Sequence, residues 1–335
     1  MDVRYERVTA LDGAARWHAL EERSVPLDHP GLLADPLEEV ASLLNRDETD
    51  ERAALFVATD GSRDLANALV WLPMRDNLEN AGIFLTVDPD HRRQGVGGRF
   101  ARFLLEFARG EGRRRAVFYG PAPLDGGEAP GTVLAERFGA KLAFLGVRRQ
   151  LDVATIDVAR LDALEKERVG DHAKGYELVT WIDTVPEHLV DDAAALMARM
   201  GTDAPMGDLA HEPEVWDAAR YRRKEEEAME RSRRRYATGA VECESGRMVA
   251  YTDIGVSVIQ PLVAYQWDTI VDPEHRGHRL GLLVKIANLK ALRRFSPTTA
   301  SIQTWNADSN EHMVAINDEL GFRPAEYSKQ WQLEF

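Results

Sequence analysis

Cysteine is nearly absent from this sequence, with Cys243 the single one in 335 residues. A lone cysteine excludes a disulfide within the chain and leaves too few thiolates for a structural zinc site. The nine histidines form no His-x-x-x-His pair and no cluster with carboxylates. We therefore expect no catalytic metal either.

Positive charge is also in short supply. The 42 lysines and arginines are outnumbered by 56 aspartates and glutamates, which gives a formal net charge of -14. A general nucleic-acid binder needs a basic face to displace counterions from phosphates, so we expect no nucleic-acid partner. The negative charge instead favours a cationic substrate such as an amine.

Long apolar runs are missing as well. No segment approaches the roughly 20 apolar residues that span a bilayer, and we expect no association with a membrane. The first ten residues include Asp2, Arg4, Glu6 and Arg7 and are not followed by an apolar run. We therefore expect no signal peptide and a cytoplasmic location.

What the sequence does contain is an internal repeat. Three short segments recur in the same order, at offsets of 184, 182 and 182 residues. Matches in order at nearly constant spacing indicate two copies of one fold, and the chain length suits two domains of about 150 residues each. The matching segments are 87–93 with 271–277, 134–140 with 316–322, and 150–152 with 332–334.

The repeat sets the expected domain boundaries. We predict one domain over residues 1–153, a charged helical connector over 154–175 and a second domain over 176–335. In both halves two strand-like runs flank a turn, at Asp60-Gly61 and at Ser245-Gly246, as in a hairpin. Strand and helix patterns follow one another in each half, so we expect two α/β domains.

One segment of the first domain has the pattern of an anion-binding site. A strand over 82–87 runs into a loop with Gly95, Gly97 and Gly98, and an amphipathic helix over 99–109 follows. Glycine lets the backbone approach a ligand closely, and unpaired N–H groups at a helix start attract phosphate. A Gly-x-Gly also fits an ordinary turn or helix cap. The spacing matches neither the ATP-type phosphate loop nor the dinucleotide pattern.

The wider pattern Val-Asp-Pro-x-His-Arg-Arg-x-Gly-x-Gly at 87–97 resembles the acetyl-CoA signature of the GNAT superfamily of N-acetyltransferases. Arg92, Gly95 and Gly97 occupy the positions of its short form, Arg/Gln-x-x-Gly-x-Gly/Ala. The second domain shows the same arrangement around 271–281. The resemblance implies two tandem GNAT-type domains, each a mixed, largely antiparallel sheet flanked by helices, in an architecture similar to that of mycothiol synthase.

The resemblance also implies acetyl-CoA as the acyl donor, with its pantetheine arm along the strand before the loop and its pyrophosphate on the helix start. In the second domain the residue matching Gly95 is Arg279, which either adds a charge for a phosphate or is solvated. Asn306 and Asn310 resemble the family's second cofactor motif, although asparagine also favours turns and helix caps. The residues that the resemblance assigns to the cofactor are Leu85, Val87, Arg92, Arg93, Gln94, Gly95, Val96, Gly97, Gly98, Val271, Arg276, Gly277, His278, Arg279, Gly281, Asn306 and Asn310.

Asp268 is the candidate catalytic residue. A carboxylate inside the strand 263–271 is unusual, because aspartate is depleted in strands. Alternation along that strand predicts Gln266, Asp268 and Ile270 on one face. Because family members often place a basic carboxylate here, the resemblance implies that Asp268 is the general base or orients the amine; the alternative is an edge residue paired with an arginine. The first domain has Phe84 at the matching position, so we expect the second domain to be the catalytic half.

The general acid is less well marked. The family's usual acid is a tyrosine four residues before a Gly-Phe pair, and that position holds Asn317 in the second domain and Ala135 in the first. Tyr327 is a weak candidate to replace it, and otherwise the thiolate leaves without direct protonation.

These observations predict an acetyl-CoA-dependent N-acetyltransferase that moves the acyl group directly to the amine of a small molecule through a tetrahedral intermediate. The sequence shows no Ser-His-Asp or Cys-His nucleophile set, which agrees with a reaction that forms no covalent enzyme intermediate. Two alternatives stay open, a non-catalytic acyl-CoA-binding or sensor protein and a protein-lysine acetyltransferase. The sequence identifies neither the acceptor nor the oligomeric state.

Overall fold

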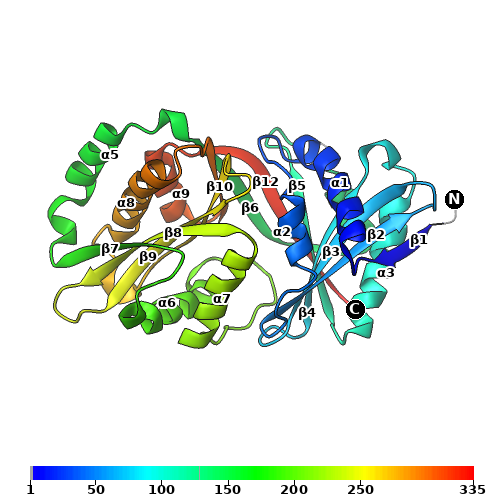
Figure 1. The fold of residues 1–335 in the computed structure, drawn as a ribbon, viewed down its shortest axis with the longest axis horizontal. Coiled ribbons are helices and arrows are strands. Elements are labelled where there is room, and N and C mark those ends of the chain that lie inside the picture. The colour runs from blue at the N-terminus through cyan, green and yellow to red at the C-terminus, as the bar shows by residue number, and fades with distance from the viewer. Residues whose placement is uncertain (1–2, 128) are drawn as a thin grey trace. The chain divides into compact units, whose positions relative to one another are not determined.

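The structure, a computed structural model, describes residues 3–127 and 129–335. Its contacts divide the chain into two compact units, which we describe separately (Figure 1). The first unit comprises the chain up to Val147 together with Gly207–Glu212 and Ala325–Phe335. The second comprises Arg148–Met206 and Pro213–Pro324.

The sheet of the first unit has the strand order β1-β2-β3-β4-β5-β12. Strands β4 and β5 are parallel, whereas the pairs β1–β2, β2–β3, β3–β4 and β5–β12 are antiparallel. The elements of this unit are β1 (Arg4–Arg7), α1 (Leu11–Asp28), α2 (Leu37–Ser42), β2 (Glu51–Thr59), β3 (Asp64–Pro73), β4 (Asn80–Val87), α3 (Val96–Gly110), β5 (Arg115–Ala122), α4 (Pro130–Arg137), the first part of β6 (Lys141–Asp152) and most of β12 (Arg323–Glu334).

Helices cover both faces of this sheet. Along β2, Leu55 and Val57 pack in the cluster that includes α1 and α2, whereas Phe56 and Ala58 pack in the cluster that includes α3. Successive strand residues point to opposite faces, so a strand covered on both sides reads as a continuous apolar run. The first unit is therefore a three-layer α/β arrangement.

The sheet of the second unit continues from the last part of β6 in the order β11-β10-β9-β8-β7. Strands β10 and β11 are parallel, and β7–β8, β8–β9 and β9–β10 are antiparallel. The elements are α5 (Val158–Leu164), β7 (Tyr176–Ile182), α6 (Val190–Asp203), α7 (Ala218–Glu230), β8 (Arg233–Glu242), β9 (Met248–Ser257), β10 (Val263–Val271), α8 (Leu280–Phe295), β11 (Ser301–Ala307) and α9 (Glu311–Leu320).

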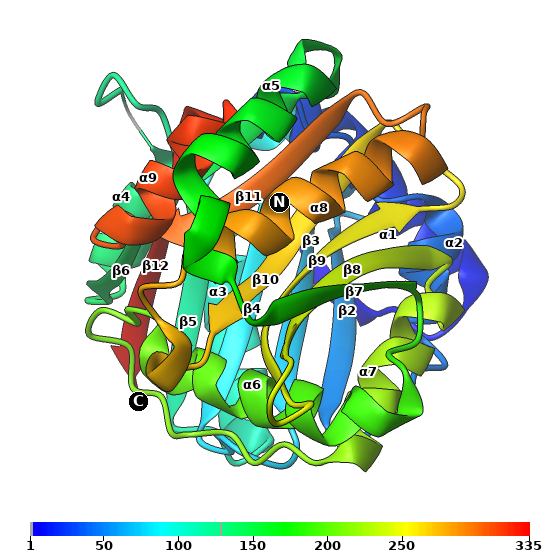
Figure 2. The same cartoon turned by 90° about the vertical axis from the view of Figure 1, so that its left-hand side faces the viewer.

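Helices again lie on both faces of the sheet. Figure 2 shows strands β7 to β10 between α8 on one side and α6 with α7 on the other. Ala250 and Ile254 of β9 pack in the cluster around α8, whereas Tyr251 packs in the cluster that contains α6. The α/β class expected from the sequence, with mixed and largely antiparallel sheets, is confirmed.

The last strands of the two halves do not follow the expected division. From Ala325 on, β12 belongs to the first unit, where Trp331 lies opposite Phe118 of β5. From Arg148 on, β6 belongs to the second unit. Sequence similarity cannot reveal this arrangement, because strands at equivalent places in a repeat carry similar patterns and either can complete either sheet. The boundaries at 153 and 176 stay a prediction about the repeat.

In the part of the chain that the structure describes, no helix is both long and apolar enough to cross a bilayer.

Candidate functional site

The loop after β4 has the backbone geometry of an anion site. Gly95 adopts a left-handed φ of 79° and forms the N-cap of α3. A Cβ at Gly97 would lie only 3.2 Å from Val87 Cγ2. The absence of a side chain at residue 97 therefore allows the start of α3 to pack against the end of β4. A Cβ at Gly98 would meet nothing within 4 Å. The start of α3 therefore leaves open space beside its unpaired N–H groups.

Polar side chains of this loop have structural partners. The guanidinium of Arg92 donates to both carboxylate oxygens of Asp28, at 2.8 and 2.7 Å, and to the carbonyl oxygen of Val87 at 3.0 Å. Gln94 Nε2 donates to a backbone carbonyl within the loop at 3.2 Å. Arg93 has a left-handed φ of 63°. The signature arginine thus ties the end of α1 to the loop, and the backbone is the part left for a phosphate.

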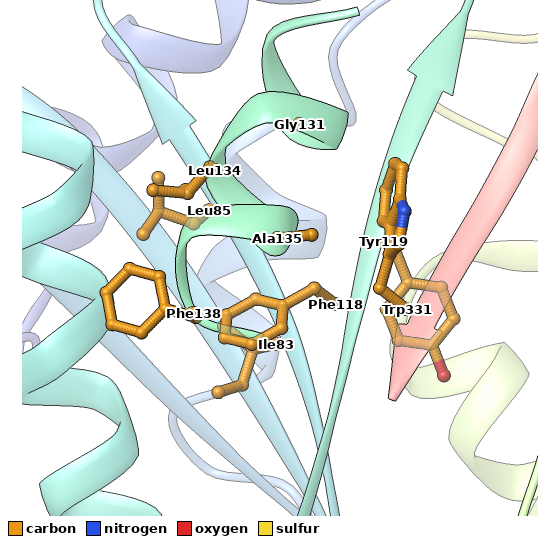
Figure 3. A pocket seen from close by; sticks show the side chains of 9 residues that line it. All are labelled: Ile83, Leu85, Phe118, Tyr119, Gly131, Leu134, Ala135, Phe138 and Trp331. Atoms are coloured by element: carbon orange, nitrogen blue, oxygen red, sulfur yellow. The ribbon is translucent and has the colours of Figure 1, made fainter. Parts of the chain in front are cut away.

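Strands β4 and β5 separate next to this loop. Their parallel pairing runs from Asn80 opposite Arg115 to Ile83 opposite Phe118, and the part of β4 beyond Ile83 has no β5 partner in this register. An apolar cavity of ≈ 40 Å³ lies there, between β4, β5, α4 and β12 (Figure 3). Leu85, expected beside the cofactor, is one of its lining residues.

A carboxylate occupies the other face of β4. Thr86 lies opposite Asn67 of β3, and Asn67 Nδ2 donates to Glu21 Oε1 at 2.8 Å. Thr86 also hydrogen-bonds Glu21, which comes from α1. Burial raises the pKa of Glu21 above its ordinary value, and this outweighs the two hydrogen bonds and the nearby His29, which favour the charged form. A carboxyl group with a raised pKa is a stronger base once it has lost its proton.

Further charged and aromatic groups line the same face. His29 Nδ1 lies 2.7 Å from Glu326 Oε1, and the Glu326 side chain is 5% exposed. Phe84 and Tyr119 stack with ring centroids 4.3 Å apart, and burial raises the pKa of Tyr119 to about 12. The face of β4 next to Glu21 is therefore both acidic and aromatic, and these properties suit a cationic amine.

In the second unit, other residues of the same unit contact the equivalent loop. Arg279 forms the N-cap of α8 with a left-handed φ of 57°. This conformation is sterically unfavourable for a residue with a Cβ atom, whereas the glycine at position 95 adopts it freely. His278 Nδ1 lies 2.8 Å from the carbonyl oxygen of His172, and His275 Nδ1 lies 2.9 Å from the hydroxyl of Tyr176.

Other residues of this loop are engaged or closely packed as well. Arg276 pairs with Asp203 at 2.8 Å. Gly277 has a left-handed φ of 89°. A Cβ at Gly281 would meet Val271 and Ile316 at 3.6 Å, which is ordinary contact.

Strand β10 contains a bulge that the alternation argument missed. The β9–β10 register shifts between Gln266 and Thr269, which places one extra residue in β10. Gln266 Nε2 donates to Thr252 Oγ1 at 2.9 Å, whereas Asp268 faces Tyr251, the neighbour of Thr252 on β9. Gln266 and Asp268 therefore lie on opposite faces, and the prediction that they share one was wrong.

Asp268 is held in an ion pair. Its Oδ2 accepts from Lys224 Nζ at 2.8 Å and lies 3.5 Å from the Tyr251 hydroxyl, and its backbone N–H donates to Asp253 Oδ1 at 3.0 Å. Burial acts to raise the pKa of Asp268, but the charge and hydrogen bond of Lys224, together with Arg235, outweigh it and hold the pKa below its ordinary value. A carboxylate stabilised in this way is a weak proton acceptor.

The remaining residues expected at the second cofactor site also have partners within the unit. Asn310 Oδ1 accepts from the backbone N–H of Met313 and caps α9 at 3.1 Å. Asn306 Oδ1 accepts from Asn317 Nδ2 at 2.6 Å. Tyr327 was the candidate general acid for the second domain. It pairs instead with Ala122 of β5 in the first unit, because β12 completes that sheet.

Sequence reasoning missed Glu21, His29 and Glu326. Glu21 and His29 carry no motif, since α1 reads as an ordinary helix with buried Trp17 and Leu20. Glu326 reaches the site through the last strand of the chain. Within residues 3–127 and 129–335, no group of three or more histidine, cysteine, aspartate or glutamate side chains is arranged to hold a metal ion.

Comparisons with known proteins agree with this geometry. Residues 19–121 match the profile of the acetyltransferase (GNAT) family. The chain is similar to a tandem GNAT protein from the clavulanic acid biosynthesis pathway, solved without AcCoA, with 27% identity, coverage of 99% of this chain and 98% of that one, and a TM-score of 0.82. A GCN5-related N-acetyltransferase from Sphaerobacter thermophilus shares the fold at 16% identity, with coverage of 99% and 95% and a TM-score of 0.65. A sequence search of curated proteins gave no significant match.

Proposed function

Since residues 19–121 of this chain belong to the GNAT family of acetyltransferases, we propose that the protein is an acyl-CoA-dependent N-acyltransferase whose transfer site lies in the first unit. The observation that carries the proposal is the loop at Gly95 to Gly98 beside separated strands. The pyrophosphate of the donor binds at the start of α3, and its pantetheine arm adds to the free edge of β4 beyond Ile83.

The proposed reaction is a direct transfer. The amine nitrogen attacks the thioester carbonyl carbon, an N–C bond forms, and the oxygen takes up negative charge in a tetrahedral intermediate. Backbone N–H groups at the free edge of β4 stabilise that charge. The C–S bond then breaks, CoA leaves as its thiolate, and the proton lost by the amine passes to a side-chain base.

Glu21 is the base that the geometry supports best. It is hydrogen-bonded to Thr86, which follows Leu85 in the part of β4 that no longer pairs with β5, so its carboxylate lies across the strand from the cavity. Burial raises its pKa, whereas Lys224 lowers that of Asp268. We therefore move the proposed base from Asp268 to Glu21 and the catalytic role from the second unit to the first.

The proposed acceptor is a small-molecule amine. Glu21, Glu326 and the stacked Phe84 and Tyr119 offer negative charge and an aromatic surface on the acceptor side of β4. Both features stabilise an ammonium ion. The net charge of -14 acts in the same direction at long range.

Binding tests the donor site. Replacing Gly95 by Asp puts a carboxylate where the pyrophosphate lies, and we expect acetyl-CoA affinity to fall by about 100-fold. Arg279→Asp, the equivalent change in the second unit, is the matched control and leaves the affinity unchanged. Calorimetry measures both affinities. If the Gly95 variant bound acetyl-CoA normally and the Arg279 variant did not, the donor site would lie in the second unit.

A second candidate function is acyl-CoA binding without transfer. It is favoured by Ala135, which stands where the resemblance places a catalytic tyrosine. Release of free thiol from acetyl-CoA in the presence of a panel of amines, measured continuously, separates the two functions. Binding without release for every amine supports the sensor.

A further inference from the structure

The cavity of the first unit is apolar on nearly every side. Its lining comes from β4, β5, α4 and β12 and includes Ile83, Leu85, Phe118 and Leu134 (Figure 3). A cavity of this kind stays dry and accepts apolar groups. Its volume of ≈ 40 Å³ corresponds to roughly three groups of water size, since one such group needs about 10–15 Å³.

The position of the cavity matches the end of the donor's arm. Ile83 and Phe118 form the last pair of the β4–β5 register, and both line the cavity. Leu85 and Tyr119, the next lining residues on the two strands, flank the point of separation. A pantetheine arm that runs from the start of α3 along β4 ends at this point, so its acyl group meets the cavity.

Small residues keep the cavity open. Ala135 of α4 lines it and is 3% exposed, so a larger side chain there would fill it. Gly120 and Gly131 allow the Trp331 ring to pack on the backbone, since Cβ atoms at these positions would lie 3.2 and 3.6 Å from the ring. Trp331 thus closes one wall without filling the space.

The second unit has polar residues at equivalent positions. By the offsets of the repeat, Thr269 corresponds to Leu85 and Asn317 to Ala135. Gln266, the first residue of β10 beyond its last pair with β11, is 3% exposed with its Oε1 unpaired within the described residues. Two positions that line the apolar cavity of the first unit are therefore polar in the second unit.

We propose that the acyl donor carries a chain longer than acetyl, of about four carbons, and that the tail of this chain fills the cavity beside Ile83, Phe118 and Ala135. The inference rests on the proposed function. The cavity has room for roughly three groups of water size. The methyl carbon of an acetyl group fills one of these positions, and two further carbons of a longer chain fill the other two. The donor is then a butyryl-type CoA thioester.

Affinity for a series of CoA thioesters tests the inference. Each buried methylene contributes about fourfold, the equivalent of about 0.8 kcal/mol. We expect butyryl-CoA to bind about 15-fold more tightly than acetyl-CoA, and hexanoyl-CoA to gain nothing further. Calorimetry with free CoA, acetyl-CoA, propionyl-CoA, butyryl-CoA and hexanoyl-CoA gives the profile.

A variant that fills the cavity provides the decisive comparison. Ala135→Leu removes the space, so we expect the ratio of butyryl-CoA to acetyl-CoA affinity to fall to about one while free CoA binds as before. Glu136→Leu, which adds the same side chain at the exposed neighbouring position of α4, keeps the ratio. Ala135→Val is the smaller change to use if the leucine variant does not fold.

Three results would have different meanings. Equal affinity for acetyl-CoA and butyryl-CoA, with both lost in the Gly95→Asp variant, overturns the inference and leaves the proposed function intact. Affinities for all thioesters that are unaffected by Gly95→Asp overturn the proposed function itself. A butyryl preference that survives Ala135→Leu places the acyl tail elsewhere and also overturns the inference.

Discussion

The two units share a strand, a loop and a helix, but they differ in what surrounds that loop. In the first unit Gly95 makes the left-handed turn at no steric cost, and space stays open at Gly98. In the second unit Arg279 makes the same turn, and His172 and Tyr176 bond to the loop. The two loops therefore share a backbone conformation but differ in the space and the contacts beside the helix start.

The carboxylates of the two units differ in the same sense. Glu21 is partly buried and accepts hydrogen bonds from the side chains of Asn67 and Thr86, and burial raises its pKa. Asp268 is buried beside Lys224, and its pKa is lowered. An ion pair stabilises a structure but removes the basicity that proton transfer needs. The carboxylate that the sequence pattern indicated and the base that we propose are therefore in different halves.

The largest expected effect tests this contrast directly. Glu21→Gln keeps the shape and removes the base, so we expect turnover to fall by about 10²–10⁴ with acetyl-CoA affinity unchanged. The parent's kcat/KM should rise with pH as Glu21 loses its proton, with an apparent pKa above that of an ordinary glutamate, and the variant should lack this rise. Initial rates of thiol release between pH 4 and 9 give both results.

Two controls accompany that experiment. Glu22→Gln alters the exposed neighbour on α1 and leaves the rate unchanged. Asp268→Asn lowers the rate less than threefold if the second unit is not the catalytic half. A loss of 100-fold in the Asp268 variant with Glu21 dispensable would reverse the assignment.

The next effect concerns stability. The Arg235–Asp253 pair of the second unit is 2.7 Å long, with side chains 2% and 0% exposed. Asp253→Ala leaves a buried guanidinium without its charge partner, and we expect the free energy of unfolding to fall by about 3–5 kcal/mol. The matched change in the first unit is Asp64→Ala, which breaks the part-exposed pair with Arg16 and costs about 0–1 kcal/mol. Urea denaturation followed by tryptophan fluorescence measures both, and equal losses would contradict the prediction.

A pH dependence of stability distinguishes the two units next. Lys285 of α8 is 1% exposed, and burial lowers its pKa to about 7, whereas its equivalent in the first unit is the buried Ala101. Between pH 7 and about 10.4 the unfolded chain binds a proton that the folded chain does not, so stability rises with pH in this window. Lys285→Met removes that rise and increases stability at pH 7 by up to about 4 kcal/mol.

Lys290 of the same helix is the control for that prediction. Its pKa is raised, chiefly because hydrogen bonds and charges of Asp162 and Glu165 outweigh its burial. The contribution of such a group is lost only as the pH rises above about 10.4, so Lys290→Met does not change the slope between pH 7 and 10. Urea denaturation at a series of pH values measures the slopes, and a rise that remains in the Lys285 variant would contradict the argument.

The sequence predicted those features that local rules decide. The repeat, the loop at Gly95 and the strand before it follow from spacing and from glycine chemistry, so the fold class and the backbone form of the proposed donor loop were accessible. The bulge at Asp268 was not, because one extra residue in a strand leaves no mark in the composition and inverts every face assignment beyond it.

Contacts between distant segments were out of reach for a different reason. Glu326 lies near His29 because the last strand joins the first sheet, and Asn67 meets Glu21 only after β3 and α1 have packed. Lys224 pairs with Asp268 across 44 residues. No pattern within a segment encodes such a partner, and the partner decides whether a carboxylate is a base or a structural ion.

The smallest expected effect is an exchange of the two turn residues. Gly95 has a φ of 79° and Arg279 a φ of 57°. Gly95→Ala forces a side chain into the left-handed region and lowers the free energy of unfolding by about 1 kcal/mol. Arg279→Gly relieves that strain but gives the unfolded chain more freedom, and the two terms cancel to within about 0.5 kcal/mol.

Binding stoichiometry makes the exchange informative about function. His278 bonds to His172 and Arg276 pairs with Asp203, and neither contact involves the side chain at 279. A glycine at that position therefore relieves the turn without freeing the loop, and we expect the parent and the Arg279→Gly variant each to bind one acetyl-CoA per chain. If calorimetry found two acetyl-CoA molecules bound per variant chain, the Arg279 side chain alone would have blocked the second site. The difference in binding between the two units would then depend on the turn residue only.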